Sequence, residues 1–387
     1  MAVPTFTKED LMGKGNGMEI DVVELTSELI AMPSETQTSN RAISDFLRGV
    51  LEAGGFAVEE LAYIDHFDVE KVSLVAKKGA GAGGLGLFSH SDTVPGDAGW
   101  DPFTPALEDG RLVGRGSADM KGPLAASIAA GYRFDAADLE RPLVIAVTAD
   151  EERAHVGAHD IVKRSQTLTG GWPQYCIVCE PSQLQPVYAH KGGAGITVTA
   201  HGVAAHTSTD KGVSANFKIA PFLAEMAELA QTFRTDKRFQ NPLFDPPTNG
   251  FNLVISDGDT ATNVTAARTV VRMGIRAMPD ACFEEAVQLV LERAEAHGLD
   301  VVHRKGGPFF ADADGPLAQA ACRATGAPRA VTVPYGTEAT CYQNYMDALV
   351  LGPGNIDQAH TVGEWIAVEQ LHEAVEVYTR LIGDLCG

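Results

Sequence analysis

Apolar runs and amphipathic stretches alternate along the first half of the chain. Apolar residues recur at helical spacing in residues 21–32 and 39–55. Short runs rich in Val, Leu and Ile, typical of strands, occupy residues 71–78, 85–90, 143–149 and 175–180. Of these, Leu143–Val147 is uncharged throughout, which fits a strand buried on both faces. Strands that alternate with helices predict an α/β domain with a mostly parallel sheet.

The pattern changes near Lys191. From there to residue 307 we predict a strand, a long amphipathic helix, two strands, a helix and a strand, which is the β-α-β-β-α-β order of a ferredoxin-like unit. Helices and strands then alternate again from Pro316 to the C-terminus. We therefore expect an α/β domain made of residues 1–190 and 308–387, with an inserted α+β domain at residues 191–307.

Charge and composition narrow the range of partners. The formal net charge is −21, and the 30 Lys and Arg residues are scattered, which argues against nucleic-acid or anionic-membrane binding. No apolar run approaches the ~20 residues needed to span a bilayer. The first 21 residues lack the pattern of a signal peptide, and six Cys are sparse, so we expect a cytoplasmic protein with reduced thiols.

A glycine-rich stretch, "GAGAGG", contains the G-x-G-x-x-G spacing of dinucleotide-binding loops at Gly79, Gly81 and Gly84. That fingerprint requires a strand before the glycines and a helix after them. Here a predicted strand follows, so we interpret the stretch as a surface turn. The hypothesis of a nicotinamide-dependent enzyme would rest on this stretch alone.

Histidine and carboxylate side chains follow three of the predicted parallel strands. "LGLFSHSD" ends with His90 and Asp92, "LVIAVTADEE" ends with Glu151 and Glu152, and "YCIVCE" ends on Glu180. Ligand sites in open α/β sheets lie at the carboxyl ends of the strands. A buried carboxylate is costly unless it is paired or binds a metal, so these acids indicate a cation site at that edge.

Two further candidates lie in glycine-rich loops. Asp119 is in "GRGSADMKG", and His360 ends "VLGPGNIDQAH". Mixed imidazole and carboxylate ligands suit Zn²⁺ and related divalent ions.

Several motifs together resemble one known family. "SHSDTVP", "GRGSADMKGPLA", "TADEE", "CEPS" and "GPGNIDQAHTVGE" are similar, in order and spacing, to motifs of the acetylornithine deacetylase, succinyl-diaminopimelate desuccinylase and aminoacylase family of co-catalytic metallohydrolases. The resemblance runs from about residue 20 to the C-terminus. Within the family, "LQPVYAHKG", "GTEA" and "LVLGPGNIDQAH" most resemble the acetylornithine deacetylases.

The resemblance implies two divalent metal ions, Zn²⁺ or Co²⁺, and assigns their ligands. His90 and Glu180 match the ligands of one ion, and Glu152 and His360 match those of the second. Asp119 matches the carboxylate that bridges both. The family also implies a cis peptide bond after Asp119.

The same resemblance assigns three catalytic roles. Glu151 falls on the general base, and Asp92 falls on the residue that orients His90. His206, in the inserted domain, falls on a histidine that stabilises the oxyanion in the partner subunit of a homodimer, which would form through residues 191–307. Asp150 receives no role.

Four residues are predicted to contact substrate. Asn263 and Arg276 lie in a segment similar to one that binds substrate in the family, and a guanidinium suits a bidentate grip on an α-carboxylate. Thr337 and Glu338 lie in "YGTEAT", where Glu338 would pair with the δ-ammonium of an ornithine substrate. The alternative for Glu338 is an acid that favours the start of a helix.

Together, these expectations predict an amidohydrolase that removes an acyl group from a small N-acyl-L-amino acid. The resemblance favours N²-acetyl-L-ornithine, which gives ornithine and acetate in arginine biosynthesis. A dipeptidase, aminoacylase or desuccinylase on the same scaffold is the alternative within the enzyme class. An inactive metal-binding regulator is a further alternative, and the presence of Glu151 argues against it.

Overall fold

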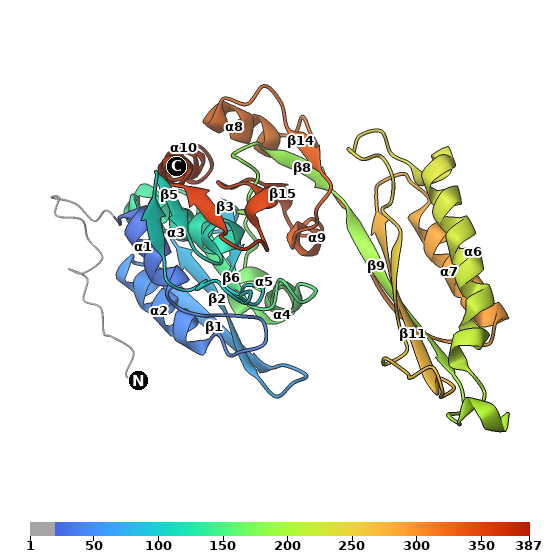
Figure 1. Cartoon of the computed structure of the whole chain (residues 1–387). Coiled ribbons are helices and arrows are strands. Elements are labelled where there is room, and N and C mark those ends of the chain that lie inside the picture. The colour runs from blue at the N-terminus through green and yellow to red at the C-terminus, as the bar shows by residue number, and fades with distance from the viewer. Residues whose placement is uncertain (1–19) are drawn as a thin grey trace. The chain divides into compact units, whose positions relative to one another are not determined.

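Two compact units make up the computed structural model, which describes residues 20–387 (Figure 1). The first unit contains the chain up to Tyr188, then Ala311–Val331 and Thr337–Gly387. The second unit contains Ala189–Phe310 and the short segment Thr332–Gly336, which we had expected in the first domain. Thr332 belongs there because its hydroxyl donates a hydrogen bond to the Leu243 carbonyl. The N-terminal stretch without a signal-peptide pattern lies almost wholly outside the described residues.

The first unit is built on a large sheet. Its strands follow the order β1-β2-β6-β3-β7-β15-β8, with β6, β3, β7 and β15 parallel and the other pairs antiparallel. The mostly parallel α/β fold is thereby confirmed. The strand bounds are Ala57–Ile64 for β1, Glu70–Lys78 for β2, Leu85–His90 for β3, Leu143–Thr148 for β6, Tyr175–Val178 for β7, Val187–His190 for β8 and Asp347–Val350 for β15.

Every residue of β3, β6 and β7 is buried, as their uncharged sequences predict. Two short strands, β13 and β14, also pair with β8. A separate small sheet joins the predicted hairpin, β4 and β5, to β16. The bounds of these five strands are Ala106–Glu108, Arg111–Val113, Phe309–Phe310, Val331–Val333 and Trp365–Ala367 in chain order.

Five helices of the first unit, α1, α2, α3, α8 and α10, share one hydrophobic core with the sheet. The alanine-rich α3 is buried along its whole length and packs against α1 and α10. Asp21 begins α1 by accepting hydrogen bonds from the Val23 and Glu24 N–H groups. The helices are α1 (Val22–Ile30), α2 (Arg41–Ala53), α3 (Gly122–Tyr132), α4 (Val156–Arg164), α5 (Gln166–Thr169), α8 (Pro316–Thr325), α9 (Ala339–Tyr342) and α10 (Val368–Cys386).

The second unit has the predicted β-α-β-β-α-β order. Its sheet runs β10-β11-β9-β12 with every neighbouring pair antiparallel, which is the ferredoxin-like arrangement. Alternate residues of β9 and β11 pack against α6 and α7 in a core of their own. The elements are β9 (Gly192–His201), α6 (Ala215–Thr235), β10 (Asn252–Ser256), β11 (Arg268–Ala277), α7 (Phe283–Ala296) and β12 (Asp300–Gly306).

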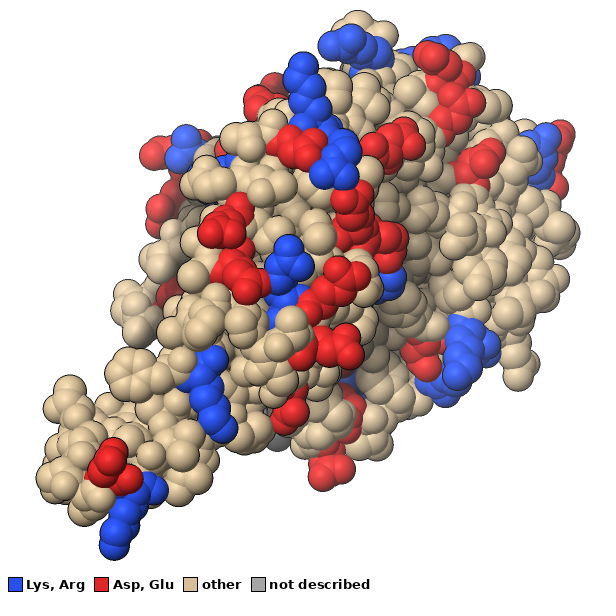
Figure 2. All heavy atoms as spheres, turned by 90° about the vertical axis from the view of Figure 1, so that its right-hand side faces the viewer, with Lys and Arg blue, Asp and Glu red and all other residues tan. Residues whose placement is uncertain are grey.

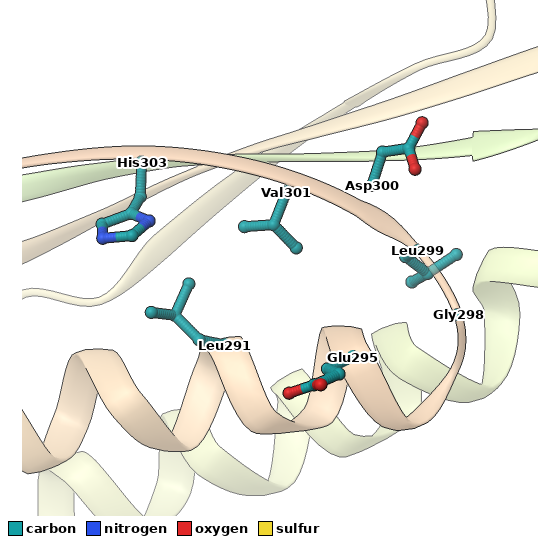
Figure 3. Close-up of a pocket in the computed structure, with 7 residues that line it drawn as sticks. All are labelled: Leu291, Glu295, Gly298, Leu299, Asp300, Val301 and His303. Atoms are coloured by element: carbon teal, nitrogen blue, oxygen red, sulfur yellow. The ribbon is translucent and has the colours of Figure 1, made fainter.

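Surface features add little to the search for a site. On the face shown in Figure 2, acidic and basic side chains are interspersed. A hollow of about 460 Å³ lies between α7 and β12 in the second unit (Figure 3), and none of the predicted site residues lines it. Between residues 20 and 387, no helix combines the length and the apolar character needed to cross a membrane.

Candidate metal centre and active site

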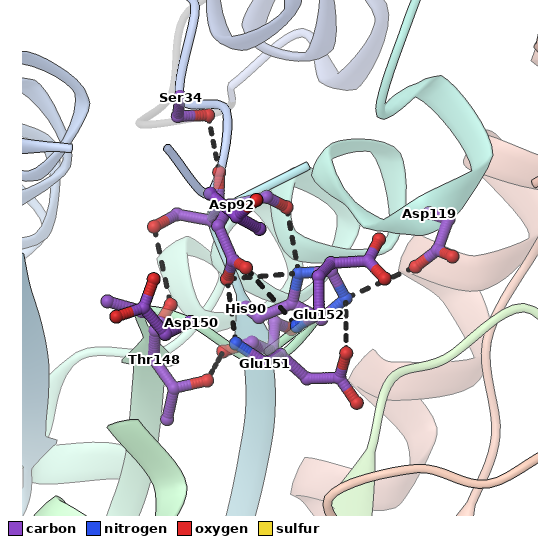
Figure 4. A network of polar contacts seen from close by, with 12 residues as sticks. Ser34, His90, Asp92, Asp119, Thr148, Asp150, Glu151 and Glu152 are labelled. Carbon is purple, nitrogen blue, oxygen red and sulfur yellow. Dashed lines mark hydrogen bonds and ion pairs between the residues drawn. The ribbon is translucent and has the colours of Figure 1, made fainter. Parts of the chain in front are cut away.

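His90, at the end of β3, is the central side chain of a buried polar cluster (Figure 4). Its Nδ1 donates a hydrogen bond to the Asp92 main-chain carbonyl at 3.0 Å, so Nε2 is the nitrogen that faces the cluster. Nε2 lies 3.1 Å from Asp119 Oδ1 and 3.6 Å from Glu180 Oε1. The structure therefore places Nε2 of this imidazole beside two carboxylates from other segments.

Asp119 lies between two groups of candidate ligands. Its Oδ1 faces His90, whereas its Oδ2 lies 3.3 Å from His360 Nε2. His360 Nε2 also lies 2.9 Å from Glu152 Oε1. The two oxygens of Asp119 thus divide between a group with His90 and Glu180 and a group with His360 and Glu152. That division is the geometry a bridging carboxylate needs.

The loop that carries Asp119 is held by a buried ion pair. Glu364 Oε1 accepts hydrogen bonds from the Ala118 and Asp119 N–H groups at 3.0 and 3.1 Å. Its Oε2 accepts one from Arg115 at 2.9 Å. The peptide bond between Asp119 and Met120 is cis, as predicted. Glu364 thereby fixes the main chain on which the bridging candidate is mounted.

Asp92 holds the turn that follows β6. Its Oδ1 accepts from the Glu151 N–H at 3.1 Å, and its Oδ2 accepts from the Glu152 N–H at 3.2 Å. Asp92 Oδ1 is 3.6 Å from His90 Nδ1. The imidazole is instead oriented by the hydrogen bond that its Nδ1 donates to the Asp92 main-chain carbonyl. Burial raises the pKa of the Asp92 carboxyl to about 6. Its two N–H donors favour the ionised form.

Asp150, the acid without a predicted role, forms a separate buried ion pair. Its Oδ1 lies 3.0 Å from Lys71 Nζ, and Tyr63 donates a hydrogen bond to its Oδ2 at 2.9 Å. Lys71 Nζ also donates to two main-chain carbonyls, those of Thr36 and Thr38, at 2.8 Å each. Asp150 is therefore neutralised by Lys71 and anchors the first residue of the turn.

Glu151 reaches the cluster with one oxygen. Its Oε2 lies 4.0 Å from His90 Nε2, and its Oε1 lies 3.3 Å from His155 Nδ1. His155 was not among the predicted site residues, because its sequence position gives no sign of this contact. The carboxylate that the family resemblance assigns as base thus lies close to His90 and Glu180, and its other oxygen faces His155.

The excess of buried carboxyl groups in this cluster favours the binding of cations. Burial raises the pKa of both the Glu151 and Glu180 carboxyls well above the usual range. Hydrogen bonds to Asp119 and then Glu152 raise the pKa of His360 to about 10. Within residues 20–387, groups of side chains close enough to share a metal ion are His90, Asp119 and Glu152, and His90, Glu151 and Glu180. Buried acids that outnumber their positive partners fit a site for divalent ions.

Glu338 is fully buried next to Thr148, the last residue of β6. Its Oε2 accepts a hydrogen bond from Thr148 Oγ1 at 2.8 Å, and burial raises the pKa of its carboxyl to about 7. The Glu338 side chain makes no capping hydrogen bond at α9; Thr337 Oγ1 accepts from the Ala339 N–H there instead. Its burial gives no support to the predicted pairing with a substrate ammonium.

Known proteins resemble this chain over most of its length. Residues 86–384 match the family described as peptidase family M20/M25/M40. The chain belongs to this family. It is 34% identical to an acetylornithine deacetylase of Proteus mirabilis, over 94% of this chain and 96% of that protein. The resemblance found in the sequence motifs is confirmed, and this M20-family protein is an amide-bond hydrolase.

Solved structures of low sequence identity share the fold. An M20-family metallo-carboxypeptidase of Sulfolobus solfataricus has a TM-score of 0.75 at 16% identity, over 94% of this chain and 98% of that one. A protein of Bacillus subtilis, described as a dinuclear metal binding peptidase from the M20 family, has a TM-score of 0.61 at 14% identity, over 94% and 97%. Both span nearly the whole of this M20-family hydrolase.

Three predicted site residues of this M20-family hydrolase belong to the second unit. His206 is exposed at the start of a short helical turn, and its Nδ1 lies 2.7 Å from Ser208 Oγ. Asn263 is exposed, and its carbonyl accepts a hydrogen bond from the main chain at 3.0 Å. Arg276 is exposed on β11. Their roles therefore stay predictions.

Proposed function

We propose that this M20-family hydrolase removes the acetyl group from N²-acetyl-L-ornithine, with two divalent ions, Zn²⁺ or Co²⁺, as cofactors. The products are acetate and ornithine, so the reaction would be a step of arginine biosynthesis in the cytoplasm. The observation that carries the proposal is the position of Asp119, whose two oxygens face two separate imidazole–carboxylate groups. The relative from Proteus mirabilis, an acetylornithine deacetylase, supports the substrate.

The proposal assigns the five candidate ligands to the two ions. His90 and Glu180 would hold one ion, Glu152 and His360 the other, and Asp119 both. When bound, such ions lower the pKa of water and polarise the carbonyl of the amide. The Bacillus subtilis neighbour, whose description names a dinuclear centre, supports a pair rather than a single ion.

Glu151 is the proton carrier in this proposal. Its Oε2 is on the His90 side of the carboxylate, where it can take a proton from the attacking water. The same carboxyl group then gives that proton to the amine nitrogen as the amide bond breaks. Asp92 and Asp150 keep the turn in place during both transfers, because one binds the N–H groups of the turn and the other is bound to Lys71.

Substrate recognition and assembly would use the second unit. Arg276 would bind the α-carboxylate of the substrate with help from Asn263, and His206 would donate a hydrogen bond to the oxyanion in the active site of a partner subunit. Both edge strands of this sheet, β10 and β12, have one partner each among the described strands. Val302 on β12 is 74% exposed. A free edge with exposed apolar side chains supports pairing with a second copy.

A panel of substrates tests the proposal. Protein loaded with Zn²⁺ or Co²⁺ is assayed with N²-acetyl-L-ornithine, an N-succinyl amino acid, an uncharged N-acetyl amino acid and a dipeptide. We expect kcat/KM to be highest for acetylornithine, and metal removal to abolish turnover. A dipeptide or succinyl substrate turned over faster would assign the chain to another branch of the family. Filled metal sites without turnover on any substrate would favour a regulator.

A further inference from the structure

The two oxygens of Glu151 have different neighbours. Oε2 lies on the side of His90, whereas Oε1 lies 3.3 Å from Nδ1 of His155. His155 immediately precedes α4, and its own N–H donates a hydrogen bond to the Glu151 carbonyl at 3.0 Å. Both the main chain and the side chain of His155 therefore contact the residue proposed to carry the proton.

The imidazole of His155 has a buried nitrogen without a hydrogen bond. Nδ1 is shielded from solvent, and among the described residues no atom satisfies it with good geometry. Burial, and then the charges of His159 and His90, lower the pKa of His155 to about 4. The ring is neutral at neutral pH and can carry its single proton on Nδ1. A buried unpaired nitrogen is unfavourable, and the carboxylate of Glu151 is the acceptor within reach.

The backbone of His155 does not explain why a histidine stands there. Its φ of 57° and ψ of 35° are left-handed, a conformation that Asn and Gly adopt at least as readily. His159, one turn further along α4, faces a different group, because its Nε2 lies 3.7 Å from Cys341 Sγ. The imidazole of His155 is thus the feature that needs a function.

We propose that His155 is a positioning residue for the general base, and that its Nδ1–H hydrogen-bonds to Glu151 Oε1. A carboxylate rotates as a rigid unit about its last bond, so fixing Oε1 also fixes Oε2. The hydrogen bond keeps Oε2 directed to the metal centre, where the proton of the attacking water has to be collected. This inference rests on the proposed function, since it assumes that Glu151 is the base.

Two substitutions that suit the left-handed backbone separate the imidazole from the fold. His155→Asn places an amide nitrogen near the position of Nδ1, and His155→Gly removes the side chain. His159→Asn, on the same helix, is the matched control. We expect His155→Gly to lower kcat by about 10–100-fold, because a misplacement of about 1 Å at a reacting group can lower a rate by about that factor. KM and metal content should stay at the parent values, and His155→Asn should retain kcat within about threefold.

A double-mutant cycle shows whether His155 acts through Glu151. In a Glu151→Gln background, His155→Gly should cause no further loss, because the group to be positioned has already been removed. An equal loss in both backgrounds overturns the inference, and so does a His155→Gly variant as active as the parent. If the parent turns over none of the substrates, the proposed function fails, and that result is distinct from either outcome here.

A spectroscopic readout tests the contact without turnover. ¹⁵N spectra of imidazole-labelled, metal-loaded protein report which nitrogen of His155 bears the proton. We expect a protonated Nδ1 whose resonance shifts in Glu151→Gln and not in His159→Asn. An Nδ1 without a proton, or a resonance that does not respond to Glu151→Gln, contradicts the hydrogen bond.

Discussion

Replacing Glu364 by Gln tests whether one buried carboxylate joins the two loops that carry Asp119 and His360. Its Oε1 accepts from two main-chain N–H groups, including that of Asp119 at 3.1 Å, and its Oε2 accepts from Arg115 at 2.9 Å. Arg115 in turn donates to the carbonyl of Thr361 at 3.2 Å, in the loop of His360. The carboxylate therefore connects both sides of the candidate metal centre.

The expected loss follows from burial. The side chains of Glu364 and Arg115 are 0% and 1% exposed, so no solvent can replace the lost charge. Gln keeps one oxygen for the N–H groups but turns an amide donor towards the guanidinium. Removing one partner of a buried ion pair costs about 3–5 kcal/mol. Arg115 keeps a second carboxylate, the half-exposed Asp97 at 3.0 Å, so we expect the lower end, about 3 kcal/mol of unfolding free energy.

Urea unfolding of the metal-free protein measures this loss, and competition with a chelator measures metal affinity. Loss of a residue that supports metal ligands typically weakens affinity about 10–100-fold, and we expect a change in this range. Glu369→Gln, an exposed acid five residues later, is the control and should change neither quantity. A Glu364→Gln protein that loses less than about 1 kcal/mol and binds metal as the parent does would refute the role given to Glu364.

Three other predictions address the turn, the metal ligands and the assembly. Lys71→Met should lower the unfolding free energy by about 3 kcal/mol in urea unfolding, because Asp150 becomes an unpaired buried charge, and adding Asp150→Asn should recover part of the loss. His360, whose pKa is raised from 6.5 to about 10, must lose a proton to bind metal. Its proton stabilises the metal-free fold fully below pH 6.5, and this contribution disappears as the pH rises to about 10. Metal affinity, measured by competition with a chelator, should therefore increase across that window. A metal affinity that does not change with pH would contradict this prediction. Mixing inactive Glu151→Gln and His206→Ala chains should restore acetate release in hybrid dimers, and no recovery despite subunit exchange would place His206 in its own subunit or outside catalysis.

Uncharged, β-branched strands made most of the fold predictable. The run from Leu143 to Thr148 is buried throughout, and periodicity identified such strands and the inserted unit. Strand β1 was not predicted because Glu59 and Glu60 break its apolar pattern, and Leu61 is its one fully buried residue. As an edge strand whose one partner among the described strands is β2, it needs little apolar surface.

Strand ends also led to the candidate ligands, because parallel strands bring their carboxyl ends to one edge. Supporting contacts were not predictable in the same way. Arg115 and Glu364 are 249 positions apart, and Lys71 and Asp150 meet only when β2 pairs with β6. The contact of His155 depends on two consecutive residues with positive φ before α4, Ala154 and His155, for which the sequence offers no signal.

The most direct test of the account is the Glu151→Gln variant, assayed for bound metal and for acetate release from N²-acetyl-L-ornithine in the same preparation. The five ligands remain in this variant, so we predict two ions per chain, as in the parent. Turnover should fall by about 10²–10⁴-fold, the usual contribution of a general base. A variant that loses metal would make Glu151 a ligand, and a variant that keeps its turnover would contradict its role as the base.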